Sequence, residues 1–352
     1  MASPAILRAC LDLMHFSGAT ALGRNQLQGI GHIFCLHHVC PGGGRQKHFA
    51  PNNKLEIEPE FLADMIALVR SKGFETVSLG EAITRVKSGS ANAKPFSVFT
   101  MDDGYKDNNA FARPVFDRLN CPYTIFITPR IADGTCEIWW RILELLINAG
   151  PRFEATIGNE AFDLPTGSDS EKSKAWAILF PKVEELEQHE QRRVILALAN
   201  ARGIDVDGYC RSVAMDWNEL REINKDPLCT LAAHSMNHHA VGKMSAADAA
   251  FELSQSRAII TRELGENTRF NAYPYGDEPN ATPRDFKLAQ QAGYEASLTT
   301  RKGVVFPGHA SHLHALPRIM VSGRFQELRY IDAMISGLPT ALANRFSKVN
   351  VG

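Results

Sequence analysis

The sequence predicts an α/β fold, a closed or distorted (β/α) barrel whose parallel strands alternate with helices. Short apolar runs rich in β-branched residues alternate along the chain with amphipathic stretches. This alternation is typical of a parallel sheet that is covered on both faces. The chain has 352 residues, enough for one large domain with a sizeable core. The expected strands occupy residues 29–39, 96–101, 122–128, 229–234, 270–276 and 295–300.

The expected helices lie between these strands and carry recognisable end signals. Pro59 suits the first turn of a helix, and Gly73 can end that helix. Ser245 and Asp248 resemble a capping box that opens a longer helix. The expected helices occupy residues 58–72, 80–88, 245–264 and 282–292.

The stretch from 132 to 227 interrupts this rhythm. It contains a sequence that predicts a hairpin, RFEATIG followed by NEAFDLP, and charged helical segments that follow one another without core strands between them. We interpret it as an inserted, mainly helical cap within a single domain spanning 1–352. Trp139 and Trp140 in this insertion can stack on sugar rings, although such pairs are more often part of a helix core.

The composition bears on which class of molecule the protein binds and on the redox state of its compartment. The formal net charge is −1, which gives no electrostatic reason to expect a nucleic acid partner. The seven cysteines form no CxxC pair. We therefore expect no disulfide framework, which favours a reducing compartment.

The first 18 residues have Asp12 within their apolar stretch and only Arg8 as an early positive charge, a poor match to a signal peptide. Their spacing predicts an amphipathic helix docked on the protein, with attachment to a membrane surface as the alternative. No segment reaches the ~20 apolar residues that a membrane span requires. We accordingly predict a cytoplasmic protein without a transmembrane segment.

Two aspartates follow an apolar run in the sequence TMDDG (100–104). Adjacent side chains on a regular strand point to opposite faces, so Asp102 and Asp103 can serve one site only where the strand ends. Gly104 permits the sharp turn that this requires. Active sites of parallel α/β folds lie at this end of the strands, although Asp and Gly are also favoured in ordinary turns.

Three histidines lie within six residues directly after another apolar run, in HSMNHH (234–239). His234 and His238 are four residues apart and share one face if the backbone turns helically, as metal-binding histidines often do. A pair of unrelated loop histidines is the alternative. One carboxylate and two imidazoles would make three ligands with coordination left for water and substrate, as in a catalytic zinc site. The other aspartate would then be free to accept a proton.

With these residues, the chain resembles the polysaccharide deacetylases with a NodB-type homology domain, carbohydrate esterase family four. Their motif T-F-D-D-G appears here as TMDDG (100–104), H-[ST]-x-x-H as HSMNH (234–238), and R-x-P-Y-G as AYPYG (272–276), in the family's order. HHV (37–39) and LPRI (316–319) are also similar to relatives of this kind. The resemblance covers residues 30–320 apart from the insertion, and it implies a distorted (β/α) barrel of the NodB-homology type.

The resemblance also implies roles for individual residues. Asp102 becomes the general base, and Asp103, His234 and His238 become the ligands of a divalent metal, which we predict to be zinc. The backbone N–H of Tyr275 becomes the donor that stabilises an oxyanion. The implied partner is a carbohydrate, an N-acetylated amino sugar.

Two departures from the family pattern leave roles open. The arginine that usually opens the third motif is Ala272 here, so another group must orient Asp102, and Arg318 is our candidate. The family's last motif offers a histidine as general acid, and the sequence does not choose among the possible ones. The candidates are His309, His312, His314 and, as a weaker competitor, His38.

The implied function is that of a metal-dependent hydrolase that removes N-acetyl groups from an amino-sugar poly- or oligosaccharide, with metal-bound water as nucleophile. Three alternatives stay open on the same fold. The enzyme could hydrolyse another C–N bond, such as that of a ureide or a cyclic imide, or it could be an O-acetyl esterase. Without the motif arginine, it could also be a catalytically silent carbohydrate-binding protein.

Overall fold

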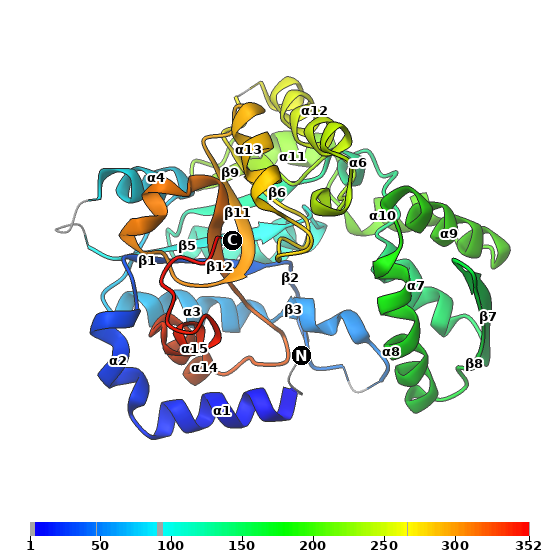
Figure 1. The fold of residues 1–352 in the computed structure, drawn as a ribbon, viewed down its shortest axis with the longest axis horizontal. Coiled ribbons are helices and arrows are strands. Elements are labelled where there is room, and N and C mark those ends of the chain that lie inside the picture. The colour runs from blue at the N-terminus through cyan, green and yellow to red at the C-terminus, as the bar shows by residue number, and fades with distance from the viewer. Residues whose placement is uncertain (1–3, 47, 90–93, 266, 352) are drawn as a thin grey trace.

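A parallel barrel forms the centre of the molecule in the computed structural model, which describes residues 4–46, 48–89, 94–265 and 267–351 (Figure 1). Its strands pair in the order β1-β12-β11-β10-β9-β6-β5, and β5 pairs in turn with β1, which closes the ring. The predicted α/β barrel is therefore confirmed. The barrel strands are β1 (Gly31–Leu36), β5 (Phe96–Asp102), β6 (Tyr123–Ile127), β9 (Cys229–Ala233), β10 (Phe270–Ala272), β11 (Ala296–Lys302) and β12 (Leu316–Met320).

Short strands flank the barrel. β4 (Glu75–Thr76) pairs with the start of β5. β2 (His38–Val39) and β3 (Glu56–Ile57) form a separate two-stranded parallel sheet. The strand expected within 29–39 is β1, which follows β5 as far as Leu36 before the chain turns toward β3.

Helices surround the barrel (Figure 1). The helix expected over 245–264 is present, and the Oγ of Ser245 accepts a hydrogen bond from the backbone N–H of Asp248 at 3.2 Å. The helices outside the cap described below are α1 (Pro4–Phe16), α2 (Ala19–Leu27), α3 (Pro59–Ser71), α4 (Leu79–Ser88), α5 (Arg113–Arg118), α6 (Pro129–Ala132), α11 (Trp217–Ile223), α12 (Ala246–Leu264), α13 (Pro283–Gln291), α14 (Leu328–Ile335) and α15 (Leu338–Ala343).

The alternation of side chains along β5 determines what faces the barrel interior. Val98 belongs to a hydrophobic cluster that draws residues from all seven barrel strands, so it lies inside the barrel. Phe99 and Met101 belong to the cluster between the barrel and the helices. Because the side-chain period of a strand is two, Thr100 and Asp102 share the inner face with Val98. The strand thus delivers a carboxylate to the inside of the barrel at its carboxyl end.

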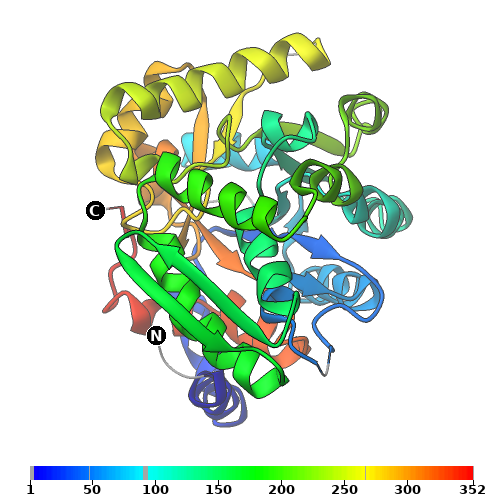
Figure 2. The ribbon, with the colours of Figure 1, turned by 90° about the vertical axis from the view of Figure 1, so that its right-hand side faces the viewer.

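Residues 139–213, which lie between β6 and β9, form a structure that we call the cap. Its helices and hairpin pack around a hydrophobic cluster of their own, which includes Ile142, Leu146, Leu179 and Ile195. The cap lies beside the barrel in Figure 1 and faces the viewer in Figure 2. The boundaries of the insertion at 132 and 227 and the single-domain assignment stay predictions. The elements of the cap are α7 (Trp139–Asn148), β7 (Arg152–Ile157), β8 (Glu160–Pro165), α8 (Asp169–Glu185), α9 (Gln188–Ala201) and α10 (Val206–Val213).

Two further properties of the described residues bear on the sequence expectations. All seven cysteines are free thiols. No helix in the described part of the chain combines the length and the apolar character that crossing a membrane would require.

Candidate metal centre

The end of β5 brings the two neighbouring aspartates into one site. Asp102 is the last residue of the strand and points into the barrel. Asp103 follows with a φ of 77°, in the left-handed region that residues other than glycine seldom adopt, and Gly104 has a φ of 74°. The backbone N–H of Met215 donates to the carbonyl of Gly104 at 3.0 Å. The expected turn at the strand end is therefore present, and it lets both carboxylates reach the same space.

Arg318 holds Asp102 in a bidentate ion pair at the barrel interior. Its Nη1 lies 2.7 Å from Oδ1 of Asp102 and its Nη2 lies 2.8 Å from Oδ2. Its Nε donates to the carbonyl of Thr299 at 3.0 Å. Burial opposes the ionisation of Asp102, but the Arg318 guanidinium outweighs it and lowers the pKa of Asp102 to about 2. Asp102 therefore has an arginine partner, Arg318, although the third motif carries Ala272 in place of its usual arginine.

The histidine loop follows β9 and orients its first imidazole. The Nδ1–H of His234 donates to the carbonyl of Ala272 at 2.7 Å, which leaves Nε2 with a lone pair. Burial lowers the pKa of His234 to about 4, so this imidazole is neutral near pH 7. Ser235 and His238 have φ values of 55° and 60°. Strained backbone of this kind persists only where the surroundings hold it in place.

Glu252, on α12, is the group that holds the histidine loop. Its Oε2 accepts the backbone N–H groups of Met236 at 3.0 Å and Asn237 at 2.9 Å, and its Oε1 accepts from the Asn237 amide. His239 Nδ1 lies 3.3 Å from Oε1. The Glu252 side chain is 2% exposed. A buried carboxylate with this many donors fixes the course of the loop between the two candidate metal ligands.

Asp103, His234 and His238 meet as a triad of buried potential ligands. Oδ1 of Asp103 lies 3.1 Å from Nε2 of His238 and 3.5 Å from Nε2 of His234. Ligand atoms around one tetrahedral ion at ~2.1 Å are separated by about 3.4 Å, close to both distances. Oδ1 of Asp103 is buried without a hydrogen-bond partner among the described residues, an unusual state for a carboxylate oxygen. The residues therefore fit a divalent metal.

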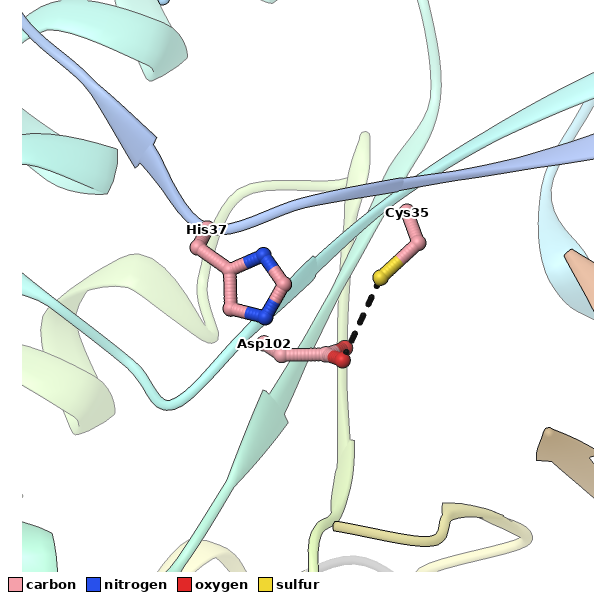
Figure 3. A group of neighbouring side chains, drawn as sticks. All are labelled: Cys35, His37 and Asp102. Atoms are coloured by element: carbon pink, nitrogen blue, oxygen red, sulfur yellow. Dashed lines mark hydrogen bonds between the residues drawn. The ribbon is translucent and has the colours of Figure 1, made fainter. Parts of the chain in front are cut away.

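A second group of potential ligands consists of Cys35, His37 and Asp102 (Figure 3). The Cys35 thiol donates to Oδ2 of Asp102 at 3.4 Å. Burial raises the pKa of that thiol well above its usual range, which disfavours the thiolate that a metal would need. Arg318 already neutralises Asp102. For both reasons the triad of Asp103, His234 and His238 suits a cation better.

His37 stands out in this second group because its imidazole faces Asp102 from the end of β1 (Figure 3). It is partly exposed, and its Nδ1 has no hydrogen-bond partner among the described residues. Burial lowers the pKa of His37. The sequence pointed to its neighbour His38 as a weaker candidate, since both follow the same apolar run and the run alone does not show which one points inward.

The histidines named from the sequence as candidate general acids contact other groups. His38 is fixed between Oδ2 of Asp107, at 2.6 Å from Nδ1, and Arg141, whose Nη2 lies 3.2 Å from Nε2. His309 accepts from the backbone N–H of Phe306 at 3.0 Å. Nδ1 of His314 lies 3.4 Å from Oγ of Ser297. His312 is exposed on the same loop. None of these described contacts reaches the triad.

Tyr275 and the cap complete the surroundings of the triad. Tyr275 follows β10 with a φ of 62°, and its backbone N–H donates to no acceptor among the described residues. Its hydroxyl accepts from Nε1 of Trp139 at 2.7 Å. The ring centre of Trp140 lies 4.7 Å from that of His238. Both tryptophans are buried in the cap cluster, so they act as core residues that also form a wall beside the triad.

Comparisons with known proteins agree with this geometry. The model of the family described as polysaccharide deacetylase matches residues 89–297. No curated protein matches the chain.

Three solved structures are similar in fold over most of this chain. The Streptococcus pyogenes deacetylase PplD shares 14% identity over 86% of this chain and 97% of its own, with a TM-score of 0.54. The de-N-acetylase from Aggregatibacter actinomycetemcomitans shares 15% identity over 86% and 99%, with a TM-score of 0.54. IcaB from Ammonifex degensii shares 17% identity over 88% and 97%, with a TM-score of 0.54.

Proposed function

This chain belongs to the polysaccharide deacetylase family, and from that premise we propose that it is a metal-dependent hydrolase that removes N-acetyl groups from an amino-sugar poly- or oligosaccharide. The observation that carries the proposal is the meeting of Asp103, His234 and His238 beside the separately anchored carboxylate of Asp102. A ligand set of one carboxylate and two imidazoles, with a second carboxylate free of the metal, suits metal-assisted hydrolysis of an amide.

Asp103, His234 and His238 would hold the metal, which we propose to be zinc. A divalent metal bound there would lower the pKa of a coordinated water to about 7 and polarise the acetyl carbonyl. The hydrogen bond from His234 to Ala272 presents Nε2 to the ion in one fixed tautomer. Glu252 keeps His238 in reach by fixing the loop before it.

Asp102 would accept the proton of the attacking water. Its two oxygens are held by Arg318, so the base has a defined position and stays ionised at neutral pH. Arg318 would thereby take the positioning role of the missing motif arginine, as predicted from the sequence.

Two groups would complete the reaction. The free backbone N–H of Tyr275 would donate to the developing oxyanion, a contribution worth about 10²–10³ in kcat where such a donor is lost. His37, the partly exposed imidazole that faces Asp102, would pass to the departing amine the proton that Asp102 takes from the water. We propose His37 for this step in place of the four histidines that the sequence offered.

The test is acetate release from N-acetylated chito-oligosaccharides, measured on the metal-loaded chain, after chelation, and after zinc is added back. We expect release that disappears with the metal and returns with it. The Asp102→Asn variant should keep its metal and lose at least about 10² in kcat, the usual scale for a general base. Faster turnover of acetyl esters or of ureides, or sugar binding without any turnover in the zinc-loaded chain, would contradict the proposal.

A further inference from the structure

Helix α1 buries Leu11 against Tyr330 and Ala333 of α14 and leaves most of its other apolar side chains exposed. It lies at the edge of the molecule beside α14 and leads into α2 (Figure 1). Two of its polar residues also contact the protein. Arg8 Nη2 donates to the carbonyl of Arg324 at 2.8 Å, and Oδ1 of Asp12 accepts from Nε of Arg329 at 2.7 Å. A helix packed on a globular core normally turns such residues to solvent.

The other face of α1 is apolar and exposed. Ala9, Cys10, Leu13 and Phe16 recur at helical spacing and are all exposed, Leu13 at 71% and Phe16 at 75%. Leu22, on α2, is 87% exposed. Among the described residues, five of the eleven exposed large hydrophobic side chains lie in these two helices, which marks the face as a site of contact rather than scattered surface.

Two arginines that form no ion pair among the described residues lie along the same helix. A cleft of about 590 Å³ runs beside α1 and is lined by Arg8, Arg324 and Phe325, with Asp12 at its wall. Neither Arg8 nor Arg324 takes part in an ion pair within the described part of the chain, whereas Asp12 is already paired with Arg329. The acidic group is neutralised and the two guanidinium groups are not. The surface beside α1 is therefore positively charged.

We propose that the exposed apolar side chains of α1 and α2, Leu13, Phe16 and Leu22, with Arg8 and Arg324 beside α1, dock on the surface of an anionic phospholipid bilayer. The apolar side chains would enter the boundary between headgroups and acyl chains, and the arginines would contact headgroup phosphates. A second copy of the chain is a poorer occupant, because a two-fold contact through this face would bring the unpaired arginines of both copies together. The proposal does not depend on the proposed function.

Co-sedimentation of the full chain with lipid vesicles tests the proposal. One set of vesicles holds phosphatidylcholine alone, and the other an equimolar mixture of phosphatidylcholine and phosphatidylglycerol. The variants are Leu13→Gln/Phe16→Gln and Arg8→Gln/Arg324→Gln. The matched control is Phe251→Gln on α12, whose side chain is 53% exposed on another face. Circular dichroism verifies the fold of each variant.

We expect the wild type to bind the anionic vesicles more tightly than the zwitterionic ones, and less tightly as salt is raised. Each double variant should bind the anionic vesicles at least about tenfold more weakly, and the control should bind like the wild type. Acetate release from a soluble chito-oligosaccharide should be unchanged in both double variants, which separates this proposal from the catalytic one. Three outcomes would overturn it: no binding of the wild type to anionic vesicles, binding that survives Leu13→Gln/Phe16→Gln, or a dimer in light scattering that this variant dissociates.

Discussion

The carboxyl end of the barrel and helix α1 depart from the usual distribution of side chains in opposite directions. The barrel end buries charge, with Asp102, Asp103 and Arg318 each at most 2% exposed. Helix α1 exposes apolar surface, most of all at Leu13 and Phe16. Buried charges and exposed apolar patches are the two departures that carry information, because polar groups usually lie outside and large apolar groups usually lie inside.

The two regions differ in what holds them in place. At the barrel end Asp102 and Arg318 pair with each other, because an unpaired charge in the interior is strongly destabilising. The exposed side chains of α1 have no such requirement, and their exposure costs the folded state little. We therefore expect changes at the barrel end to disturb folding or metal binding, and changes on α1 to disturb neither.

The largest effect should follow from Arg318→Met. The substitution leaves the buried carboxylate of Asp102 without its cation, so the free energy of unfolding should fall by about 3–5 kcal/mol. Urea denaturation measures the change. The double variant Asp102→Asn/Arg318→Met removes both charges and should recover most of the loss. If the free energy of unfolding of Arg318→Met were within about 1 kcal/mol of the wild-type value, the pair of Asp102 and Arg318 would be less desolvated than its geometry indicates.

A buried polar residue far from the triad should make stability depend on pH. Burial lowers the pKa of His32 to about 3. The unfolded imidazole titrates near about 6.5, so between these values the unfolded chain binds a proton that the folded chain does not. The free energy of unfolding should fall with decreasing pH through this window, by up to about 1.4 kcal/mol per pH unit. His32→Gln should flatten the slope in urea titrations, and an unchanged slope would assign the acid sensitivity to other groups.

A smaller effect is expected from Glu252→Gln, which touches neither the metal nor the substrate. The variant keeps one acceptor for the loop N–H groups but loses the charge that they share. Metal affinity, measured by competition with a chelator, should weaken by about 10–100-fold. Asp248→Asn on the same helix serves as the control. Should Glu252→Gln hold its metal as tightly as the wild type, the loop would be positioned by other contacts.

The smallest effect should come from α1. Leu13→Gln/Phe16→Gln changes two exposed side chains, so the free energy of unfolding should stay within about 0.5 kcal/mol of the wild type. Phe34→Ala, at a core position with 0% exposure, should cost about 3–5 kcal/mol in the same experiment. If the α1 variant were as costly as the core variant, its apolar face would be packed in solution and the comparison between the two regions would fail.

Much of the fold could be predicted from the sequence because the local signals, apolar runs and helix caps, fall where the barrel has its strands and helices. The apolar runs became barrel strands, and the capping pair of Ser245 and Asp248 opened α12 as expected. β12 was not expected as a strand, since Pro317 and Arg318 are unusual inside a central strand. Its arginine is tolerated there because Asp102 pairs with it inside the barrel.

The candidate site was less predictable where it depends on contacts distant in the sequence. The motif residues could be named because their spacing is local. Glu252 gave no signal, since a glutamate within a helix is ordinary until its contact with the histidine loop is known. Which of His37 and His38 points toward Asp102 depends on where β1 ends, and that end is set by the pairing of β1 with β5. The left-handed backbone at Asp103 and His238 could not be read from residue type either.

The central claim is that Asp103, His234 and His238 hold the metal that acetate release requires. Its most direct test is metal content by elemental analysis, together with acetate release, in wild type, His238→Ala and His189→Ala, where His189 is an exposed histidine of the cap. We predict about one metal ion per chain in wild type and His189→Ala, and loss of both metal and activity in His238→Ala. A His238→Ala chain that retains its metal and releases acetate at the wild-type rate would contradict the account.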